Sequence, residues 1–260
     1  MHKDLDKRVV ITGIGPVTSI GIGREAFWKN LLDNQDNICS IPDQFESGYQ
    51  FKSKYYVPFP EYTLEEFRFP SRMNILMEET SKLAVIGTKL AYEDAGIPVL
   101  REEEKDVSAA ERTAVILGNG ICSIKAGFEA FATHAQYDNQ ELLKKYNYGP
   151  RFNRMVIPAV MPDSPACWIS IHFGIHGETF TLNTSCASGT YAIGEEFRKL
   201  RDVYADRVVS GGVEFCQDTC GTIMRGLDTL GTLSRSENGF PLPFSVNRSG
   251  FLFAEGGGCI

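Results

Sequence analysis

The stretch Thr181-Leu182-Asn183-Thr184-Ser185-Cys186-Ala187-Ser188-Gly189-Thr190 predicts a strand that turns sharply into a helix. Phe180 to Leu182 are apolar or β-branched, which is typical of a buried strand. Residues 191–200 have a helical pattern, and the small residues at 187–189 allow a tight turn before them. Cys186 is therefore expected at the start of a helix, where unpaired backbone N–H groups favour negative charge.

Cys186 is the candidate nucleophile of the chain. A helix N-terminus favours the thiolate, which is the form of cysteine that attacks a carbonyl. The same backbone amides can stabilise the oxyanion that this attack produces. From the sequence, we expect the other six cysteines to lack this strand-to-helix position. The alternative interpretation is a small buried apolar residue, which is the usual role of a lone cysteine near a helix start.

Cys186 belongs to a series of short motifs that follow one another in a fixed order. The other members are Arg8–Thr18, Phe27–Leu32, Ala91–Ile97, Gly118–Gly120, Gly211–Glu214, Pro243–Arg248, Gly250-Phe251 and Glu255-Gly256. In this order they resemble the β-ketoacyl-acyl carrier protein synthases of the thiolase superfamily, whose nucleophile motif is similar to Cys-Ala-Ser-Gly. The resemblance implies an α/β, thiolase-like layered fold with a largely parallel sheet. Residues 1–260 would form the N-terminal domain, the first half of that fold.

The resemblance also implies an activity and its residues. Cys186 would accept an acyl group from an acyl carrier protein thioester. The acyl-enzyme would then condense with a decarboxylating malonyl-carrier, in fatty acid or polyketide synthesis. Ile121 and Leu227 would lie along the acyl pocket, although apolar residues such as these are, taken by themselves, more often ordinary core residues. Arg68 and Arg72 would help to dock the carrier protein, with ordinary solvated charges as the alternative.

Part of this chemistry is expected outside the chain. In the resembling family, condensation uses histidines, a lysine and a gating loop of the C-terminal half. The histidines here are His2, His134, His172 and His176, and none matches those motifs. We therefore expect the N-terminal part of a longer enzyme, or a chain whose remainder lies elsewhere. The alternative is a non-condensing partner subunit or a truncated product of a ketosynthase heterodimer.

Composition limits the other possibilities. A hydrophobic content of 43% and a net charge of −7 are ordinary for a globular protein and unlike a nucleic-acid binder. No apolar stretch is long enough to span a bilayer. Seven scattered cysteines favour reduced thiols and a cytoplasmic location. Cys216 and Cys220 are close in sequence, but no second pair of ligands accompanies them, so no metal site is expected. Gly13-Ile14-Gly15 is an incomplete dinucleotide-binding motif, so no cofactor is expected.

The sequence pattern predicts strands at 9–12, 113–117 and 207–210, the last ending at Gly211-Gly212. It predicts helices at 25–32, 77–95 and 126–143, a helical or extended piece at 168–173, and an irregular segment at 38–66. Strands that alternate with helices support the layered α/β class. Family members pair along strands near the nucleophile, so a homodimer, or a heterodimer with a related chain, is expected. Phe128, Phe131 and Ile121 would form part of its apolar surface.

Overall fold

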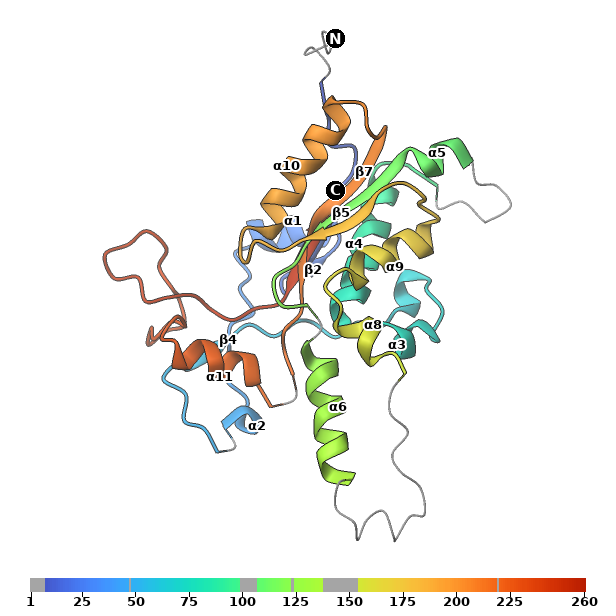
Figure 1. Cartoon of the computed structure of the whole chain (residues 1–260). Coiled ribbons are helices and arrows are strands. Elements are labelled where there is room, and N and C mark those ends of the chain that lie inside the picture. The colour runs from blue at the N-terminus through green and yellow to red at the C-terminus, as the bar shows by residue number, and fades with distance from the viewer. Residues whose placement is uncertain (1–7, 47, 99–106, 123, 138–153, 219) are drawn as a thin grey trace.

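The computed structural model describes residues 8–46, 48–98, 107–122, 124–137, 154–218 and 220–260. Within these residues a six-stranded sheet forms the centre of the molecule, in the order β2-β1-β8-β7-β5-β6. Helices lie on both of its faces (Figure 1). The strands are β1 (Gly15–Thr18), β2 (Gly21–Ile22), β5 (Thr113–Gly118), β6 (Thr179–Leu182), β7 (Arg207–Glu214) and β8 (Gly256–Cys259).

Most strands of this sheet run in one direction. β5 is parallel to both β6 and β7, whereas β8 is antiparallel to its two neighbours, β7 and β1. It follows that β1 points the same way as β5, β6 and β7. Only β8 and the two-residue β2 run in the opposite direction. The prediction of a layered α/β fold with a largely parallel sheet is confirmed.

Strand β5, which lies between β7 and β6, shows how the sheet separates two apolar layers. The helices that cover it are α4 (Glu79–Asp94), α9 (Ser164–Phe173) and α10 (Ser188–Arg201). Val115 and Leu117 pack in the cluster that includes α4 and α9, whereas Ala114 and Ile116 pack with Ala192 of α10. Successive side chains of a strand point to opposite faces, and all six residues of β5 are buried. A strand buried on both faces is expected to be a nearly continuous apolar run, as Ala114–Leu117 are in β5.

The helices predicted from the sequence are present, with shifted ends. They are α1 (Arg24–Leu32), α4, α6 (Ile124–Tyr137) and α9. The end of the helix predicted at 126–143 lies outside the described residues. The segment predicted to be irregular contains two short strands and short helical turns. The remaining elements are β3 (Cys39–Ser40), β4 (Tyr55–Tyr56), α2 (Asp43–Glu46), η1 (Glu65–Phe67), α3 (Met73–Leu76), α5 (Val107–Glu111), α8 (Val156–Val160) and α11 (Thr222–Thr229).

The strand predicted at residues 9–12 is wrong. This segment leads into β1, which begins only at Gly15, and Val10 and Ile11 are 66% and 65% exposed. β1 pairs with β8 from Gly15 onward, so among the described residues no strand lies beside residues 9–12. A β-branched run forms a strand only where a neighbour accepts its backbone hydrogen bonds.

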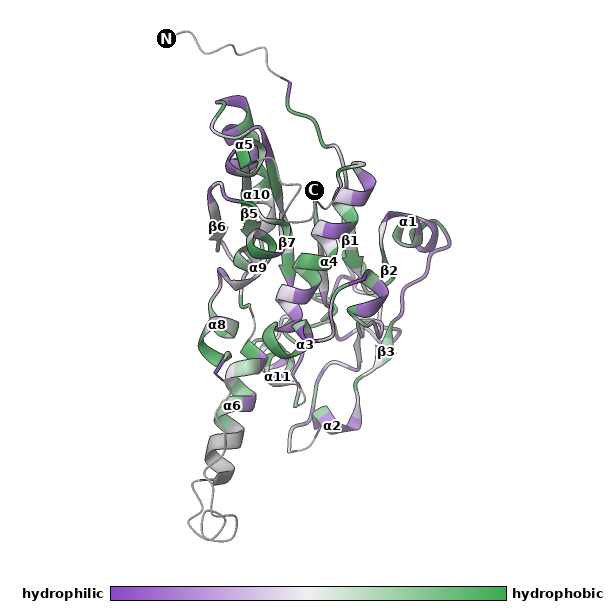
Figure 2. Ribbon diagram, turned by 90° about the vertical axis from the view of Figure 1, so that its right-hand side faces the viewer, coloured by the Kyte–Doolittle hydropathy of each residue, from purple (hydrophilic) through white to green (hydrophobic). Residues whose placement is uncertain are grey.

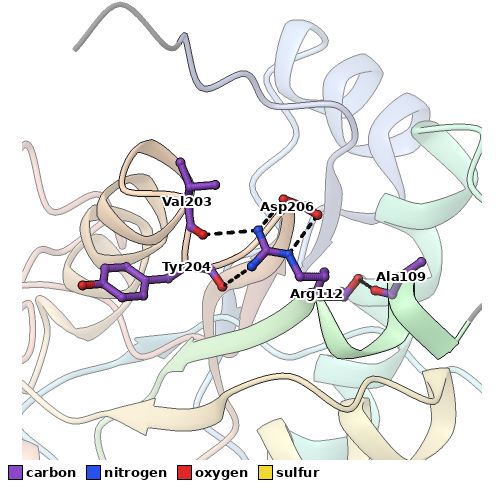
Figure 3. A network of polar contacts seen from close by, with 6 residues as sticks. Ala109, Arg112, Val203, Tyr204 and Asp206 are labelled. Atoms are coloured by element: carbon purple, nitrogen blue, oxygen red, sulfur yellow. Dashed lines mark hydrogen bonds and ion pairs between the residues drawn. The ribbon is translucent and has the colours of Figure 1, made fainter. Parts of the chain in front are cut away.

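A polar network fixes the starts of β5 and β7 (Figure 3). The guanidinium of Arg112 donates to both carboxylate oxygens of Asp206, at 3.0 and 2.6 Å. It also donates to the carbonyl oxygens of Val203 and Tyr204 in the turn after α10. Because both side chains are exposed to solvent, the pair adds little to stability. Its bidentate geometry mainly sets the position of the turn.

The two views agree that α6 extends beyond the body formed by the sheet and its covering helices (Figures 1 and 2). Phe131 of α6 is 71% exposed. Across the described ranges, no helix has the length and apolar character that crossing a membrane requires.

Candidate active site

Cys186 lies in the turn between β6 and α10, two residues before the helix begins. The hydroxyl of Ser188 ties this turn together, because it accepts from the Thr184 amide at 2.9 Å and donates to the Ser185 carbonyl at 2.6 Å. Ser185 has a φ of 55°, which is unusual for a residue other than glycine and marks how sharp the turn is. The strand–turn–helix arrangement predicted around Cys186 is confirmed.

Glycines let the start of α10 pack directly on the sheet. A Cβ atom at Gly118, the last residue of β5, would lie 2.3 Å from the carbonyl carbon of Ser188. A Cβ atom at Gly212 of β7 would lie 2.9 Å from the Cα atom of Gly189. No side chain fits at either position, so the backbone of α10 rests on the backbone of two strands. Cys186 is thereby held beside the carboxyl ends of the parallel strands, where ligands bind in many α/β folds.

A cavity of about 710 Å³ lies in front of Cys186. Ile121 and Leu227, predicted from the resemblance to line an acyl pocket, both line this cavity together with Ile223 and Phe253. The structure thus brings three of the five predicted site residues to one place. An apolar cavity of this size is large enough for a small ligand or an acyl chain. The thiol of Cys186 is exposed, so a group that enters the cavity can reach it.

Sequence reasoning missed the contacts that position Leu227. The next residue, Asp228, is 2% exposed, and its carboxylate accepts hydrogen bonds from the backbone amides of Lys52 and Ser53 at 3.0 and 3.1 Å. The Tyr49 hydroxyl donates to the same carboxylate at 2.9 Å. Asp228 therefore anchors α11 to a segment about 175 residues earlier in the chain. The sequence signal was an acidic residue four positions after Met224, on the buried face of an amphipathic helix.

Glu255 is a buried carboxyl group on the wall of the cavity. Burial raises its pKa to about 8, against the opposing effect of the backbone amides of Cys216 and Gln217. The Cys216 amide donates to Oε2 at 2.8 Å, whereas Oε1 is buried without a hydrogen-bond partner among the described residues. A carboxyl group with this pKa is mostly protonated at pH 7.

Three of the other cysteines are buried, whereas Cys39 and Cys220 are exposed like Cys186. Cys122, Cys216 and Cys259 are buried, and burial raises the pKa of Cys259 to about 11. The expectation that Cys186 alone occupies a strand-to-helix junction is wrong, because Cys122 lies between β5 and α6, two residues before that helix. Cys122 is nevertheless fully buried, and its Sγ atom lies 3.6 Å from the Met161 carbonyl oxygen. A place before a helix does not by itself separate Cys186 from Cys122; Cys186 combines that place with an exposed side chain.

The remaining two predicted site residues, Arg68 and Arg72, lie outside the cavity. Arg68 ends the helical turn η1, and Arg72 directly precedes α3. Both are exposed, and the described residues provide an ion-pair partner for neither. The buried side chains of Phe69 and Met73 anchor the segment that carries them. Its basic side chains are therefore free to meet a partner.

Two of the four histidines can be placed relative to the site. His172 packs edge-on against Phe69 and Phe173, with ring centroids 4.7 and 5.2 Å apart. The backbone amide of His176 donates to the Ala110 carbonyl. Neither residue lines the cavity in front of Cys186. The side chains of His2 and His134 lie outside the described residues.

Residues 6–260 match the model of the family described as "Beta-ketoacyl synthase, N-terminal domain". A curated relative is the "Putative 3-oxoacyl-[acyl-carrier-protein] synthase, mitochondrial" of Schizosaccharomyces pombe, 29% identical over 96% of this chain and 57% of its own length. A solved "type II PKS acyl-carrier protein in complex with its ketosynthase bound to the hexaketide" matches with a TM-score of 0.76 and 24% identity, over 97% of this chain and 57% of that one. "The ishigamide ketosynthase/chain length factor" matches with a TM-score of 0.75 and 20% identity, over 98% and 59%.

These similarities identify the protein family to which the chain, with its layered fold and its turn at Cys186, belongs. The chain is a member of the beta-ketoacyl synthase family and matches its N-terminal domain over almost its full length. The thiolase-like fold expected from the sequence is confirmed by the solved ketosynthase structures. The chain spans little more than half the length of the relatives that it matches.

Proposed function

We propose that this chain carries the nucleophile of a β-ketoacyl-acyl carrier protein synthase, with Cys186 as the acceptor of the acyl group. The observation that carries the proposal is the exposed thiol of Cys186 at the start of α10, facing an apolar cavity of about 710 Å³. Membership of the beta-ketoacyl synthase family supports it. In this proposal residues 1–260 form one N-terminal domain.

The first step is transfer of the acyl group to Cys186. The sulfur attacks the thioester carbonyl, a new carbon–sulfur bond forms, and the carbonyl oxygen becomes an oxyanion. The backbone amide of Cys186 has no acceptor among the described residues and would donate to that oxyanion. When the tetrahedral intermediate collapses, the carrier thiol leaves and takes up the proton that Cys186 gave up. Ile121 and Leu227 would enclose the acyl chain.

The acyl-enzyme would then serve decarboxylative condensation with a malonyl-carrier. The neighbouring His172 and His176 do not reach the cavity, so this step needs groups beyond those described around Cys186. The runner-up function, a non-condensing partner subunit, would not need an exposed thiol on the cavity.

The test is incubation of the protein with an acyl carrier protein thioester, followed by intact mass measurement and peptide mapping. We expect one covalent acyl group per chain, on Cys186. A chain that stays unmodified, or that carries the acyl group on Cys39 or Cys220, would support the partner-subunit function instead. Those two cysteines are also exposed, so the mapping step decides the result.

The proposed carrier-docking residues are Arg68 and Arg72. The chain has a net charge of −7, so an acidic carrier needs local basic residues on this surface. Reversal of both to Glu is expected to weaken carrier binding about tenfold at low salt, and less as salt screens the charges. A matched control reverses the exposed Lys29 and Lys52, which changes the net charge by the same amount elsewhere. Equal losses of carrier binding in the two double variants would show that Arg68 and Arg72 are not part of the docking site.

A dimer is the proposed assembly, as a homodimer or with a related synthase chain. β6 is an edge strand of the sheet, with β5 as its single neighbour among the described strands. An uncovered edge strand invites pairing with another chain, and the exposed Ile121 and Phe131 add apolar surface. Light scattering that finds a stable monomer would contradict this proposal.

A cytoplasmic location is the remaining proposal. None of the seven cysteines, all of which lie in the described ranges, forms a disulfide, which suits a reducing compartment. One curated relative is named as mitochondrial, so cell fractionation must separate the cytosol from organelles. Recovery of the protein with an organelle would exclude a cytoplasmic location.

A further inference from the structure

The loop that follows β5 is held by a carboxylate from β7. Glu214, the last residue of β7, accepts hydrogen bonds from three consecutive backbone amides: Gly120 at 2.6 Å, Ile121 at 2.9 Å and Cys122 at 2.7 Å. Hydrogen bonds to a charged acceptor are about twice as strong as neutral ones. Consecutive amides that converge on one anion form a nest, which fixes the backbone conformation.

The rest of this loop is also held by side chains. The Asn183 amide donates to the Gly120 carbonyl at 2.7 Å, and the Asn119 amide donates to the Pro162 carbonyl at 2.6 Å. Cys122 has a φ of 57°, so the loop adopts a conformation that its residues would not choose by themselves. Glu214 is the charged anchor among these contacts. Its removal frees three amides of the loop at once, whereas each asparagine side chain donates one hydrogen bond in these contacts.

The position of this loop matters because it carries Ile121. The Ile121 side chain is 46% exposed and forms part of the cavity wall beside Cys186. We propose that Glu214 is a positioning residue, which holds Ile121 against the cavity and so sets the length of acyl chain that Cys186 accepts. This inference rests on the proposed function, because the cavity must receive an acyl chain. Glu214 itself stays bonded to the loop and takes no part in the bond-making step.

Two variants disturb the contact between Glu214 and the loop, one at the carboxylate and the other at the loop. Glu214→Gln removes the charge and leaves one oxygen to accept from three amides. Gly120→Ala leaves Glu214 in place, but the new Cβ atom would lie 3.0 Å from Glu214 Oε2, so the carboxylate must move away. Glu178→Gln is the matched control, because Glu178 pairs with Lys199 at 2.5 Å and does not line the cavity.

The first measurement is hydrogen exchange of the peptide that contains residues 118–122. We expect exchange at these amides to be faster by about tenfold or more in both variants, since each lost charge-assisted hydrogen bond removes that much protection. Exchange in Glu178→Gln should match the unmodified protein. Unchanged exchange in Glu214→Gln and Gly120→Ala would overturn the proposal that Glu214 holds the loop.

The second measurement compares acylation of Cys186 by hexanoyl and dodecanoyl thioesters. A displaced Ile121 should change the ratio of the two rates by about tenfold, the size of effect that altered pocket contacts produce. Alkylation of Cys186 by iodoacetamide, which does not use the pocket, should stay within about twofold. An equal fall for both donors, with a lower melting temperature, would reduce Glu214 to a structural role. If the unmodified protein forms no acyl-enzyme, the proposed function fails and chain-length selection fails with it, while hydrogen exchange still decides whether Glu214 holds the loop.

Discussion

Replacement of Cys186 by alanine is expected to lower acyl-enzyme formation by about 10³-fold or more, because the reaction loses its nucleophile. The thiol is exposed in a turn, so its removal leaves no cavity in the core and the fold should persist. The measurement is the rate at which the protein gains the mass of one acyl group from a carrier thioester. The melting temperature should change by no more than a few degrees.

Two further variants make this result specific. Cys186→Ser keeps the shape of the side chain, but a hydroxyl is a far weaker nucleophile than a thiol, so its rate should also fall steeply. Cys220→Ala removes an exposed thiol that does not line the cavity and should leave the rate within about twofold of the unmodified protein. A Cys186→Ala protein that still gains an acyl group at a comparable rate would show that another residue is the nucleophile.

The turn at Cys186 could be predicted from the sequence because its signal is local. An apolar strand, small residues and a helical pattern follow one another within about twenty residues, and β6 and α10 form where they indicate. The burial of Cys122 could not be predicted in the same way. Its surroundings include the Met161 carbonyl, which is 39 residues away in the chain. Local pattern finds a junction between strand and helix, but only packing decides whether its thiol is exposed.

The errors in strand prediction have a similar cause. Residues 9–12 have the composition of a strand, but no neighbouring strand among the described residues pairs with them. Gly211 and Gly212 were predicted to end a strand, whereas β7 continues through both to Glu214. A Cβ atom at Gly211 would lie 2.0 Å from the Gly258 carbonyl oxygen, so a glycine is needed there for β8 to approach. In each case the partner strand, which is distant in sequence, decides the outcome.

The contacts of Glu214 in the site could not be predicted from local sequence either. The sequence places Glu214 four residues after the end of a predicted strand, in a motif that resembles the family's, but it does not indicate which amides the carboxylate accepts from. Those amides lie 92 to 94 residues earlier in the chain. The turn that carries Cys186 can therefore be predicted from local sequence, whereas the hydrogen bonds that hold the cavity wall can be found only when the strands are placed side by side.

Stability should fall as pH rises from about 5 to about 8, and Glu255→Gln should remove much of this fall. Burial raises the pKa of Glu255 from 4.5 in the unfolded chain to about 8 in the folded one. Between these values the folded protein binds more protons than the unfolded chain, so the free energy of unfolding decreases with pH. A shift of this size corresponds to an effect on the order of 3–5 kcal/mol. Below pH 4.5 both states are protonated, and the contribution of Glu255 to stability is fully present.

The measurement is denaturant unfolding of the protein and of Glu255→Gln at pH 5, 6, 7 and 8. The amide cannot ionise, so the variant should gain stability relative to the unmodified protein as pH rises. Burial also raises the pKa of Glu196, to about 7, so a weaker slope of the same sign should remain and should fall again in a double variant with Glu196→Gln. Glu237→Gln, whose side chain is 85% exposed, is the control and should keep the full slope. If Glu255→Gln and Glu237→Gln follow the same curve, Glu255 ionises in the folded protein near its ordinary pKa, and its carboxylate reaches a donor or water that its buried position does not indicate.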